Sequence, residues 1–248
     1  MEAYKNAIIN ISNQKKKIIA IDIGCARCAF LNEFLINYFN KENIEILGID
    51  PLRHSGQFDA SNHYNYYIQG CVDNIPENTV QEQTFYVNEI DQASSLLKIK
   101  TDSFTSNINN LENGFYYPQE TIDRLSKIVS TINVNVYNLN DLIRQTIGSE
   151  KMIDFIKIDA EGKDLDIAKS LKKHFHKIRY IALECSSHNN DTLEIFENGC
   201  KLTDVIQFFR ENEFDIFEHT DHSLDPNNLT QMSDVVFINK RITTHECL

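Results

Sequence analysis

Two apolar segments that lead into acidic residues constrain the fold of this chain more than any other feature. The first covers residues 18–23, carries Asp22 near its end and is followed by Gly24; the second covers residues 46–50 and ends in Asp50. Near-continuous apolar segments are typical of parallel strands buried on both faces. Ligands of such sheets bind beyond the carboxyl ends of the strands, beside the first strand–helix turn. Glycine there lets the backbone approach a ligand, and Asp50 is placed to accept hydrogen bonds from ribose hydroxyls. These segments predict a nucleoside-cofactor site.

Strand and helix patterns alternate along the rest of the chain. Apolar residues recur at helical spacing over residues 30–39, and a helix is expected from Asn140, as its N-cap, to Thr146. Strands are expected over residues 18–23, 46–50, 66–72, 84–88, 95–99, 133–137, 153–159, 178–183, 214–218 and 235–239. No full helix separates the last two strands. We therefore expect an α/β fold with a mostly parallel, Rossmann-like sheet, an antiparallel C-terminal edge strand and helices on both faces.

The sequence shows no internal repeat and no linker, so residues 1–248 are expected to form a single domain. Residues 1–17 form an N-terminal lead segment before the first strand. The polar, Asn-rich stretch 101–119 has weak periodicity and contains Tyr116 and Tyr117. We expect this insertion to be a mobile cover over the substrate, with the two tyrosines in contact with it; an ordinary packed excursion is the alternative.

Composition argues against several classes of partner. A formal net charge of −12 disfavours nucleic acid, because proteins that bind it usually display a basic surface. No segment approaches the roughly 18 uninterrupted apolar residues of a membrane span, and the first residues lack the apolar core of a signal peptide. We therefore expect a cytoplasmic protein that binds neither nucleic acid nor membrane. Its six cysteines are then expected to be thiols.

The first turn differs from a dinucleotide-binding turn. That motif uses three glycines, whereas this turn has Gly24 followed by Ala26 and Cys28 at the next two alternate positions. A pyrophosphate has less room against such a backbone, so a cofactor without phosphates is expected, and S-adenosylmethionine is the leading candidate. Its sulfonium would be attracted to the acids that end four strands, Asp22, Asp50, Asp159 and Glu184. Capping of the following helices is the alternative role of these acids.

Several motifs of the chain resemble the FkbM family of class I S-adenosylmethionine-dependent methyltransferases. The most specific is residues 153–164, an apolar strand followed by Lys-x-Asp-x-Glu-Gly and an acid two residues later. The other matching segments are residues 22–28, 49–51, 93–96, 181–184 and 234–240. The resemblance covers about residues 18–240, with the stretch 101–119 outside it. The chain departs from the family at Cys28, where glycine is usual, and at Asp50, where the family often has glutamate.

The resemblance implies transfer of a methyl group to a hydroxyl of a sugar or another small hydroxylated metabolite. Lys157, Asp159 and Glu161 would border the methyl group and this acceptor. Ser94 and Ser95 either contact the acceptor or stabilise a turn. The implied cofactor-binding residues are Asp22, Gly24, Cys25 and Ala26 at the methionine end, Asp50 and Pro51 at the ribose, and Val72 and Asp73 near the adenine.

An alcohol acceptor benefits from a general base that takes its proton in the transition state. The candidates are Asp159, Glu161 and His188. His188 titrates near neutral pH, although an exposed loop histidine is the alternative, and Glu161 could instead cap the following helix. Strand alternation places Lys157 on the same face as Asp159. Its charge would offset the mutual repulsion that raises the pKa of neighbouring carboxylates.

Four other interpretations compete with the methyltransferase. Cys25 and Cys28 have the layout of a thioredoxin-like redox motif, but that hypothesis leaves the motif 157–164 unexplained. Zinc bound by the same pair would need two more ligands, such as Cys71 and Cys185, so no metal is predicted. A nicotinamide-dependent oxidoreductase is disfavoured by the missing glycines. A scaffold without activity is also open, because fold alone does not determine function.

Overall fold

The computed structural model describes residues 4–25, 30–52, 64–100, 119–186, 196–223 and 230–243. Its strands are β1 (Ile18–Ile23), β2 (Ile44–Asp50), β3 (Tyr66–Gln69), β4 (Cys71–Val72), β5 (Val80–Asn88), β6 (Ile128–Tyr137), β7 (Ile153–Ile158), β8 (Ile178–Ser186), β9 (Phe214–Ser223) and β10 (Thr230–Asn239). Its α-helices are α1 (Lys5–Gln14), α2 (Phe30–Leu35), α4 (Gln119–Ser126), α5 (Leu139–Thr146), α6 (Asp164–Ser170), α7 (Leu202–Glu211) and α8 (Lys240–Thr243). Short 3-10 helices cover Lys41–Asn43, Asp91–Ala93 and Leu171–Lys177.

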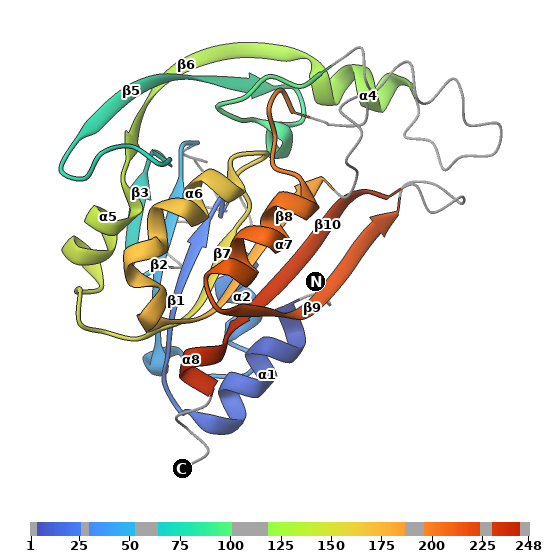
Figure 1. Cartoon of the computed structure of the whole chain (residues 1–248). Helices are drawn as coiled ribbons and strands as arrows, with labels where there is room; N and C mark the ends of the chain where they lie inside the picture. Colours follow the sequence, from blue (N-terminus) through green and yellow to red (C-terminus); the bar gives the residue numbers. More distant parts are fainter. Residues whose placement is uncertain are drawn as a thin grey trace.

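The main sheet has seven strands in the order β3-β2-β1-β7-β8-β10-β9 (Figure 1). All neighbours from β3 to β8 pair in parallel, whereas β10 runs antiparallel to both β8 and the edge strand β9. This confirms the predicted mostly parallel sheet with an antiparallel edge. The chain order reverses on either side of β1, which lies between β2 and β7. A crevice for a ligand forms at such a reversal, beyond the carboxyl ends of the strands.

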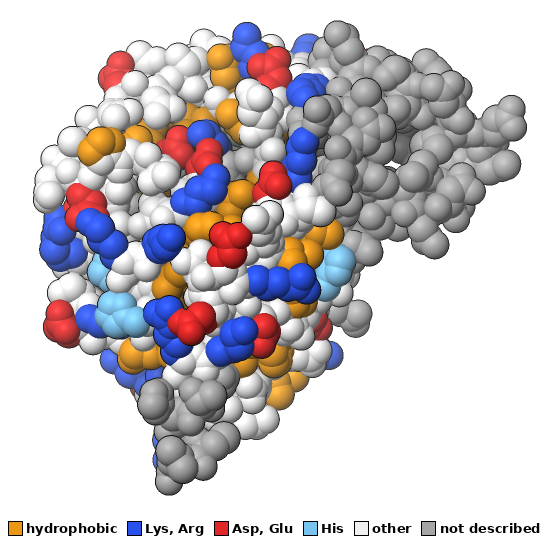
Figure 2. All heavy atoms as spheres, viewed as in Figure 1, with side chains coloured by type: hydrophobic (Ala, Val, Ile, Leu, Met, Phe, Trp, Pro, Cys, Tyr) orange, Lys and Arg blue, Asp and Glu red, His pale blue; other side chains and the backbone are white. Residues whose placement is uncertain are grey.

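Side-chain alternation along the buried strands builds a core on each face of this sheet. Ile18 and Ala20 of β1 pack with α1 and α2, whereas Ile21 and Ile23 pack with α5, α6 and α7. Figure 1 shows these two groups of helices on opposite faces. The prediction of helices on both faces is therefore confirmed. Over α5, α6 and α7, acidic and basic side chains are interspersed (Figure 2).

A second sheet, not predicted from the sequence, arches over the carboxyl edge of the first (Figure 1). It has the order β4-β6-β5, and we call it the roof. Residues 66–72 do not form one strand: β3 joins the main sheet, and β4 joins the roof after Gly70. A Cβ at Gly70 would lie 2.7 Å from the carbonyl oxygen of Asn135 in β6, so glycine permits this close crossing between the sheets.

Three expected local structures differ from those observed. Residues 84–88 and 95–99 were each expected to form a strand, but 84–88 is the end of the longer β5, which pairs with β6, and Ser95 makes only an isolated bridge to Tyr86. The expected strand 133–137 is the end of the longer β6, whose first half is exposed and lacks a buried apolar face. Helix α5 begins at Leu139, because the side chain of Asn138 caps it by accepting the Asn140 N–H at 2.9 Å.

Among the described residues, no helix combines the length and the apolar character that crossing a membrane requires.

Candidate active site

A cavity of about 440 Å³ lies between the carboxyl edge of the main sheet and the roof, since residues of both sheets line it. Its volume is within the range of small-molecule sites. The described residues that line it are Tyr4, Ile23, Gly24, Cys25, Ile49, Asp50, Pro51, Leu52, Gly70, Cys71, Val72, Phe85, Asp91, Gln92, Ser94, Leu96, Lys157, Asp159, Ala160, Glu161, Lys163, Ile167, Glu184 and Asp234. The ends of β1, β2, β4, β7 and β8 therefore meet at one site, and three of the four strand-end acids noted in the sequence, Asp50, Asp159 and Glu184, line it.

The turn after β1 is pressed against its two neighbouring strands. Gly24 has φ +69°, and a Cβ on it would lie 1.7 Å from the carbonyl oxygen of Asp159. Its N–H donates to the carbonyl of Ile49 at 3.0 Å. No side chain fits there, so glycine is required for this path of the backbone. Gly24 and Cys25 consequently line the cavity, whereas Ala26 lies outside the described residues.

The turn after β2 presents the acid expected to bind ribose. Asp50 is buried, and its Oδ1 accepts the N–H of Leu52 at 2.8 Å. Asp50 and Pro51 both line the cavity, and so does Val72 at the end of β4. Asp73 does not line it, because its carboxylate is turned to Lys163 at 2.9 Å. Of the two residues expected near the adenine, Val72 therefore lines the cavity and Asp73 lies behind it.

A chain of charges runs from β1 to β7 along the cavity wall, which Lys157 and Asp159 line and behind which Asp22 lies. The Lys157 ammonium lies 3.0 Å from Asp159 and 3.5 Å from Asp22, and it also donates to the carbonyl of Gly24 at 3.4 Å. Burial alone would lower the pKa of Lys157, but Asp159 and Asp22 raise it above its ordinary value. Lys157 therefore stays protonated and cannot act as a general base.

Asp22, expected at the methionine end of the cofactor, is fully buried and does not line the cavity. Its Oδ2 accepts the hydroxyl of Tyr64 at 2.8 Å, and its other oxygen faces Lys157. Burial raises the pKa of Asp22, while Lys157 and Tyr64 act in the opposite direction. The structure places this acid as the support of Lys157. Tyr64 was not expected from the sequence, since it lies in a polar stretch without a motif.

The turn after β7 has the most specific motif of the sequence. Glu161 and Gly162 both have positive φ, +51° and +98°. The buried carboxylate of Asp164 accepts the N–H groups of Ala160, at 3.3 Å, and Gly162, at 3.1 Å. Ser95 Oγ donates to the carbonyl of Glu161 at 2.8 Å. These bonds fix the unusual backbone, so the motif shapes the turn as well as supplying carboxylates.

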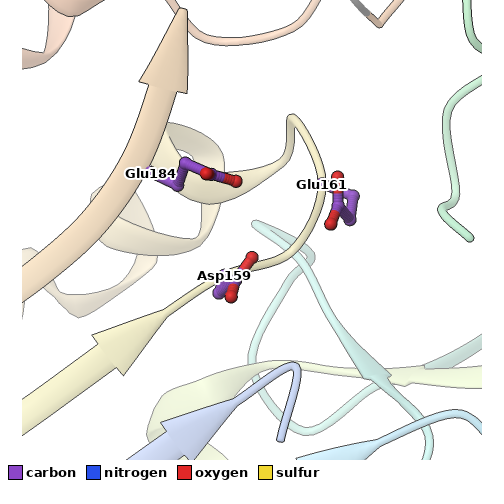
Figure 3. Close-up of side chains that lie close together, drawn as sticks. All are labelled: Asp159, Glu161 and Glu184. Atoms are coloured by element: carbon purple, nitrogen blue, oxygen red, sulfur yellow. The ribbon is translucent and has the colours of Figure 1, made fainter. Parts of the chain in front are cut away.

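Three carboxylates converge above this turn: Asp159, Glu161 and Glu184 point toward one another (Figure 3). One oxygen of each lies within 4.8 Å of the others, a spacing at which they could hold a cation. Burial, followed by the charges of Asp159 and its other acidic neighbours, raises the pKa of both Glu161 and Glu184. Glu184 was expected from the sequence only as one of the strand-end acids that attract the sulfonium, and no catalytic role was assigned to it.

Two further residues reach the same corner from distant segments. Tyr4, at the start of α1, lines the cavity and donates its hydroxyl to Asp234 of β10 at 3.2 Å. Burial, and then the charges of Asp234, Asp159 and Glu184, raise the pKa of Tyr4. Its hydroxyl is therefore neutral. Residues 1–17 were expected only as a lead segment, and no motif in the sequence indicated a role for Tyr4.

The remaining predicted residues differ in whether they line the cavity. Ser94 lines the cavity and its Oγ accepts the N–H of Asn88 at 3.0 Å, whereas Ser95 does not line it. His188, Tyr116, Tyr117 and the stretch 101–118 lie outside the described residues.

The cysteine environment does not favour the redox alternative. Cys25 is 1% exposed, and its burial, with the charges of Asp22 and Asp50, raises the thiol pKa well above its ordinary value. A reactive cysteine needs the opposite shift. Its expected partner, Cys28, lies outside the described residues.

The reversed strand order around β1, the glycine turn and the acid at the end of β2 form a Rossmann-like sheet with a ligand site at its carboxyl edge. The chain belongs to the FkbM family: the family model described as the methyltransferase FkbM domain matches residues 22–216. The close-fitting glycine turn and the buried Asp50 suit a nucleoside cofactor. Among curated proteins, no sequence matches the chain.

Several solved structures are similar to the chain at low sequence identity. One is the 1,6-didemethyltoxoflavin-N1-methyltransferase of Burkholderia thailandensis with 1,6-didemethyltoxoflavin and S-adenosylhomocysteine, at 7% identity, a TM-score of 0.43, and coverage of 96% of this chain and 78% of that one. Another is a putative rRNA methylase from Clostridium thermocellum, at 11% identity and a TM-score of 0.42, covering 95% and 96% of the two chains.

Proposed function

We propose that the protein transfers the methyl group of S-adenosylmethionine to a hydroxyl of a sugar or another small polyhydroxylated acceptor. The observation that carries this proposal is the chemistry of one corner of the cavity. Glu184 and Asp234 line it beside Asp159 and Glu161, and the Tyr4 hydroxyl already donates to Asp234. These described residues present hydrogen-bond acceptors. They suit an acceptor molecule that offers several O–H donors, and they disfavour an anionic one.

The cofactor is expected to bind along the ends of β1, β2 and β4. Gly24 and Cys25 would contact its methionine part, and Asp50, with Pro51 beside it, would accept the ribose hydroxyls. The adenine would lie against Val72. S-adenosylmethionine supplies an activated methyl group when bound. The protein then contributes by holding the acceptor oxygen in line with that group, and such alignment supplies much of the rate.

The carboxylates Glu161 and Glu184 would take the proton of the attacking hydroxyl. Their raised pKa makes each a stronger base than an ordinary carboxylate, which favours proton transfer from an alcohol near neutral pH. Asp159, held by Lys157 at 3.0 Å, would orient the acceptor. The O–H proton would then pass to one glutamate as the bond from oxygen to the methyl carbon forms and the bond from that carbon to sulfur breaks, with S-adenosylhomocysteine as the leaving group.

An amine acceptor is the second candidate, because the same carboxylates attract a cationic ammonium group. The two candidates differ in the atom that becomes methylated. The test is to incubate the purified protein with S-adenosylmethionine and a set of neutral sugars, polyols and matched amino sugars. Mass spectrometry of the product then locates the methyl group. Methylated oxygen supports the proposal, and methylation of nitrogen alone would favour the second candidate.

A further inference from the structure

Lys163 is a second cation of the cavity wall and has an environment unlike that of Lys157. Its ammonium lies 2.9 Å from Asp73, which follows β4, and 3.4 Å from Asp166 in the first turn of α6, the helix that begins after Lys163. Its side chain is 20% exposed, and the residue lines the cavity, whereas Asp73 does not. Lys163 therefore reaches the ligand space with its carboxylate partner behind it.

Apolar side chains line the same cavity as Lys163. Leu52 follows the turn after β2, Val72 ends β4, and Ile167 lies one helical turn after Lys163 on α6; all three line the cavity. Val72 and Ile167 belong to the same core cluster. Apolar walls from three different elements, with one polar group among them, are the usual construction of a pocket for a flat heteroaromatic ring.

We propose that Lys163 binds the adenine of the cofactor by donating a hydrogen bond to a ring nitrogen, and that Asp73 is the positioning residue that holds the lysine. This inference rests on the proposed location of the adenine beside Val72. The ring nitrogens of adenine accept hydrogen bonds, and an ammonium group only donates them. Asp73, expected to lie near the adenine, would then act through Lys163.

The electrostatics of the pair suit this role. Burial alone would lower the pKa of Lys163, but its pairs with Asp73 and Asp166 raise it. The ammonium is therefore charged at neutral pH, and the hydrogen bonds of charged donors are stronger than those of neutral ones. Because Asp73 is fixed by its own backbone bonds to Tyr137 and Ile75, the lysine is held at a defined place between the two sheets.

The test measures binding of S-adenosylhomocysteine by calorimetry and requires no acceptor. Lys163→Met should weaken binding about 10- to 100-fold. Lys169→Met is the matched control, because Lys169 pairs with the same Asp166 at 3.1 Å but does not line the cavity; it should bind like the wild type. Asp73→Asn should weaken binding less, and adding it to Lys163→Met should cause no further loss.

Analogues of S-adenosylhomocysteine that lack N1, N3 or N7 identify the hydrogen bond. One of them should bind the wild-type protein more weakly than the parent ligand but bind Lys163→Met equally well. Wild-type affinity in Lys163→Met, or an equal loss for every analogue, would overturn the assignment. The lysine is judged on binding alone. Failure of methyl transfer to hydroxylated acceptors would therefore count against the proposed function and not against Lys163.

Discussion

Glu161 and Glu184 differ from Asp159 in how their charges are balanced. Asp159 has the Lys157 ammonium at 3.0 Å, whereas burial and neighbouring acids raise the pKa of both glutamates. A carboxylate that repels its neighbours gains more from binding a proton. The residues suited to proton transfer are therefore the two glutamates, because burial and the neighbouring acids outweigh the effect of Lys157 on their pKa.

Glu161→Gln should reduce turnover by about 10²–10⁴-fold if Glu161 is the base, with the affinity for S-adenosylhomocysteine unchanged. Glu184→Gln should shift the acid limb of the kcat profile to lower pH. The sign follows from the repulsion: without the charge of Glu184, the pKa of Glu161 falls and the base stays ionised in more acidic solution. Steady-state kinetics across pH would measure both. An unmoved limb would contradict the coupling of the two groups.

Single acids at strand ends were the part of the site that could be predicted from the sequence. The positions of Asp50 and Asp159 follow from strand periodicity, because the ends of parallel strands share one edge. Tyr4 and Lys163 could not be found in this way. Each meets its partner from a distant segment, Asp234 for Tyr4 and Asp73 for Lys163, and one sequence holds no local signal for such pairs.

At the scale of elements, the turn between β1 and α2 depends on one glycine. Gly24→Ala should destabilise the protein by roughly 3 kcal/mol or more and abolish cofactor binding, because its Cβ would lie 1.7 Å from the Asp159 carbonyl. Gly148→Ala is the matched control: φ is also positive, +99°, but nothing lies within 4 Å of the added Cβ. Gly148→Ala should lower the free energy of unfolding by about 1–2 kcal/mol. Urea unfolding would compare the two variants, and equal losses in the free energy of unfolding would exclude a clash at Gly24.

Helix α1 connects the start of the chain to the active site. Ala7, Ile8 and Ile11 bury its apolar side against the sheet, and this packing carries Tyr4 to the cavity. The sequence predicted neither the packing of α1 against the sheet nor the position of Tyr4 at the cavity. The helix is short, and the residues against which it packs are spread over β7, β8 and β10.

Tyr4→Phe should raise the KM for the acceptor several-fold while S-adenosylhomocysteine binds as before. The variant keeps the ring, which packs 6.0 Å from Phe155, and loses only the bond to Asp234. Asn6→Ala is the control, since it removes the 2.8 Å bond from α1 to Glu218 on β9, outside the described cavity lining. If both variants weaken acceptor binding alike, the loss results from changed packing of α1 and not from removal of the Tyr4 hydroxyl.

At the scale of the whole molecule, the buried acid of the main motif links stability to pH. Burial, reinforced by the charge of Asp159, raises the pKa of Asp164 to about 7. Between about pH 4 and pH 7 the folded chain holds a proton that the unfolded chain releases. The contribution of Asp164 is therefore complete below about pH 4 and is lost as pH rises through about 7.

Asp164→Asn carries no titrating proton. The free energy of unfolding of this variant, relative to wild type, should therefore rise as pH increases from about 4 to about 7 and level off above that. Denaturant titrations at several pH values would show it. Asp204→Asn, at an exposed position in the first turn of α7, serves as the control and should show no such trend. A flat difference for Asp164→Asn would contradict the raised pKa.

The main sheet was predictable because each buried strand has its own apolar pattern and a short connection to a helix. The roof was not, since the exposed first half of β6 lacks an apolar face and its pairing with β5 spans the stretch 89–127. Gly70, where the chain passes from one sheet to the other, resembles any other loop glycine in the sequence. Its close approach to Asn135 is visible only in three dimensions.

The roof has a consequence for the order in which the chain folds. β1 and β7 are neighbours in the main sheet, yet everything from β2 to α5 separates them along the chain. All three strands of the roof come from that intervening segment. Closing a loop costs more entropy as the loop lengthens, so early pairing of β5 with β6 shortens the loop that β1 and β7 must close. During synthesis all three strands of the roof are also made before β7, whose end lines the opposite side of the cavity.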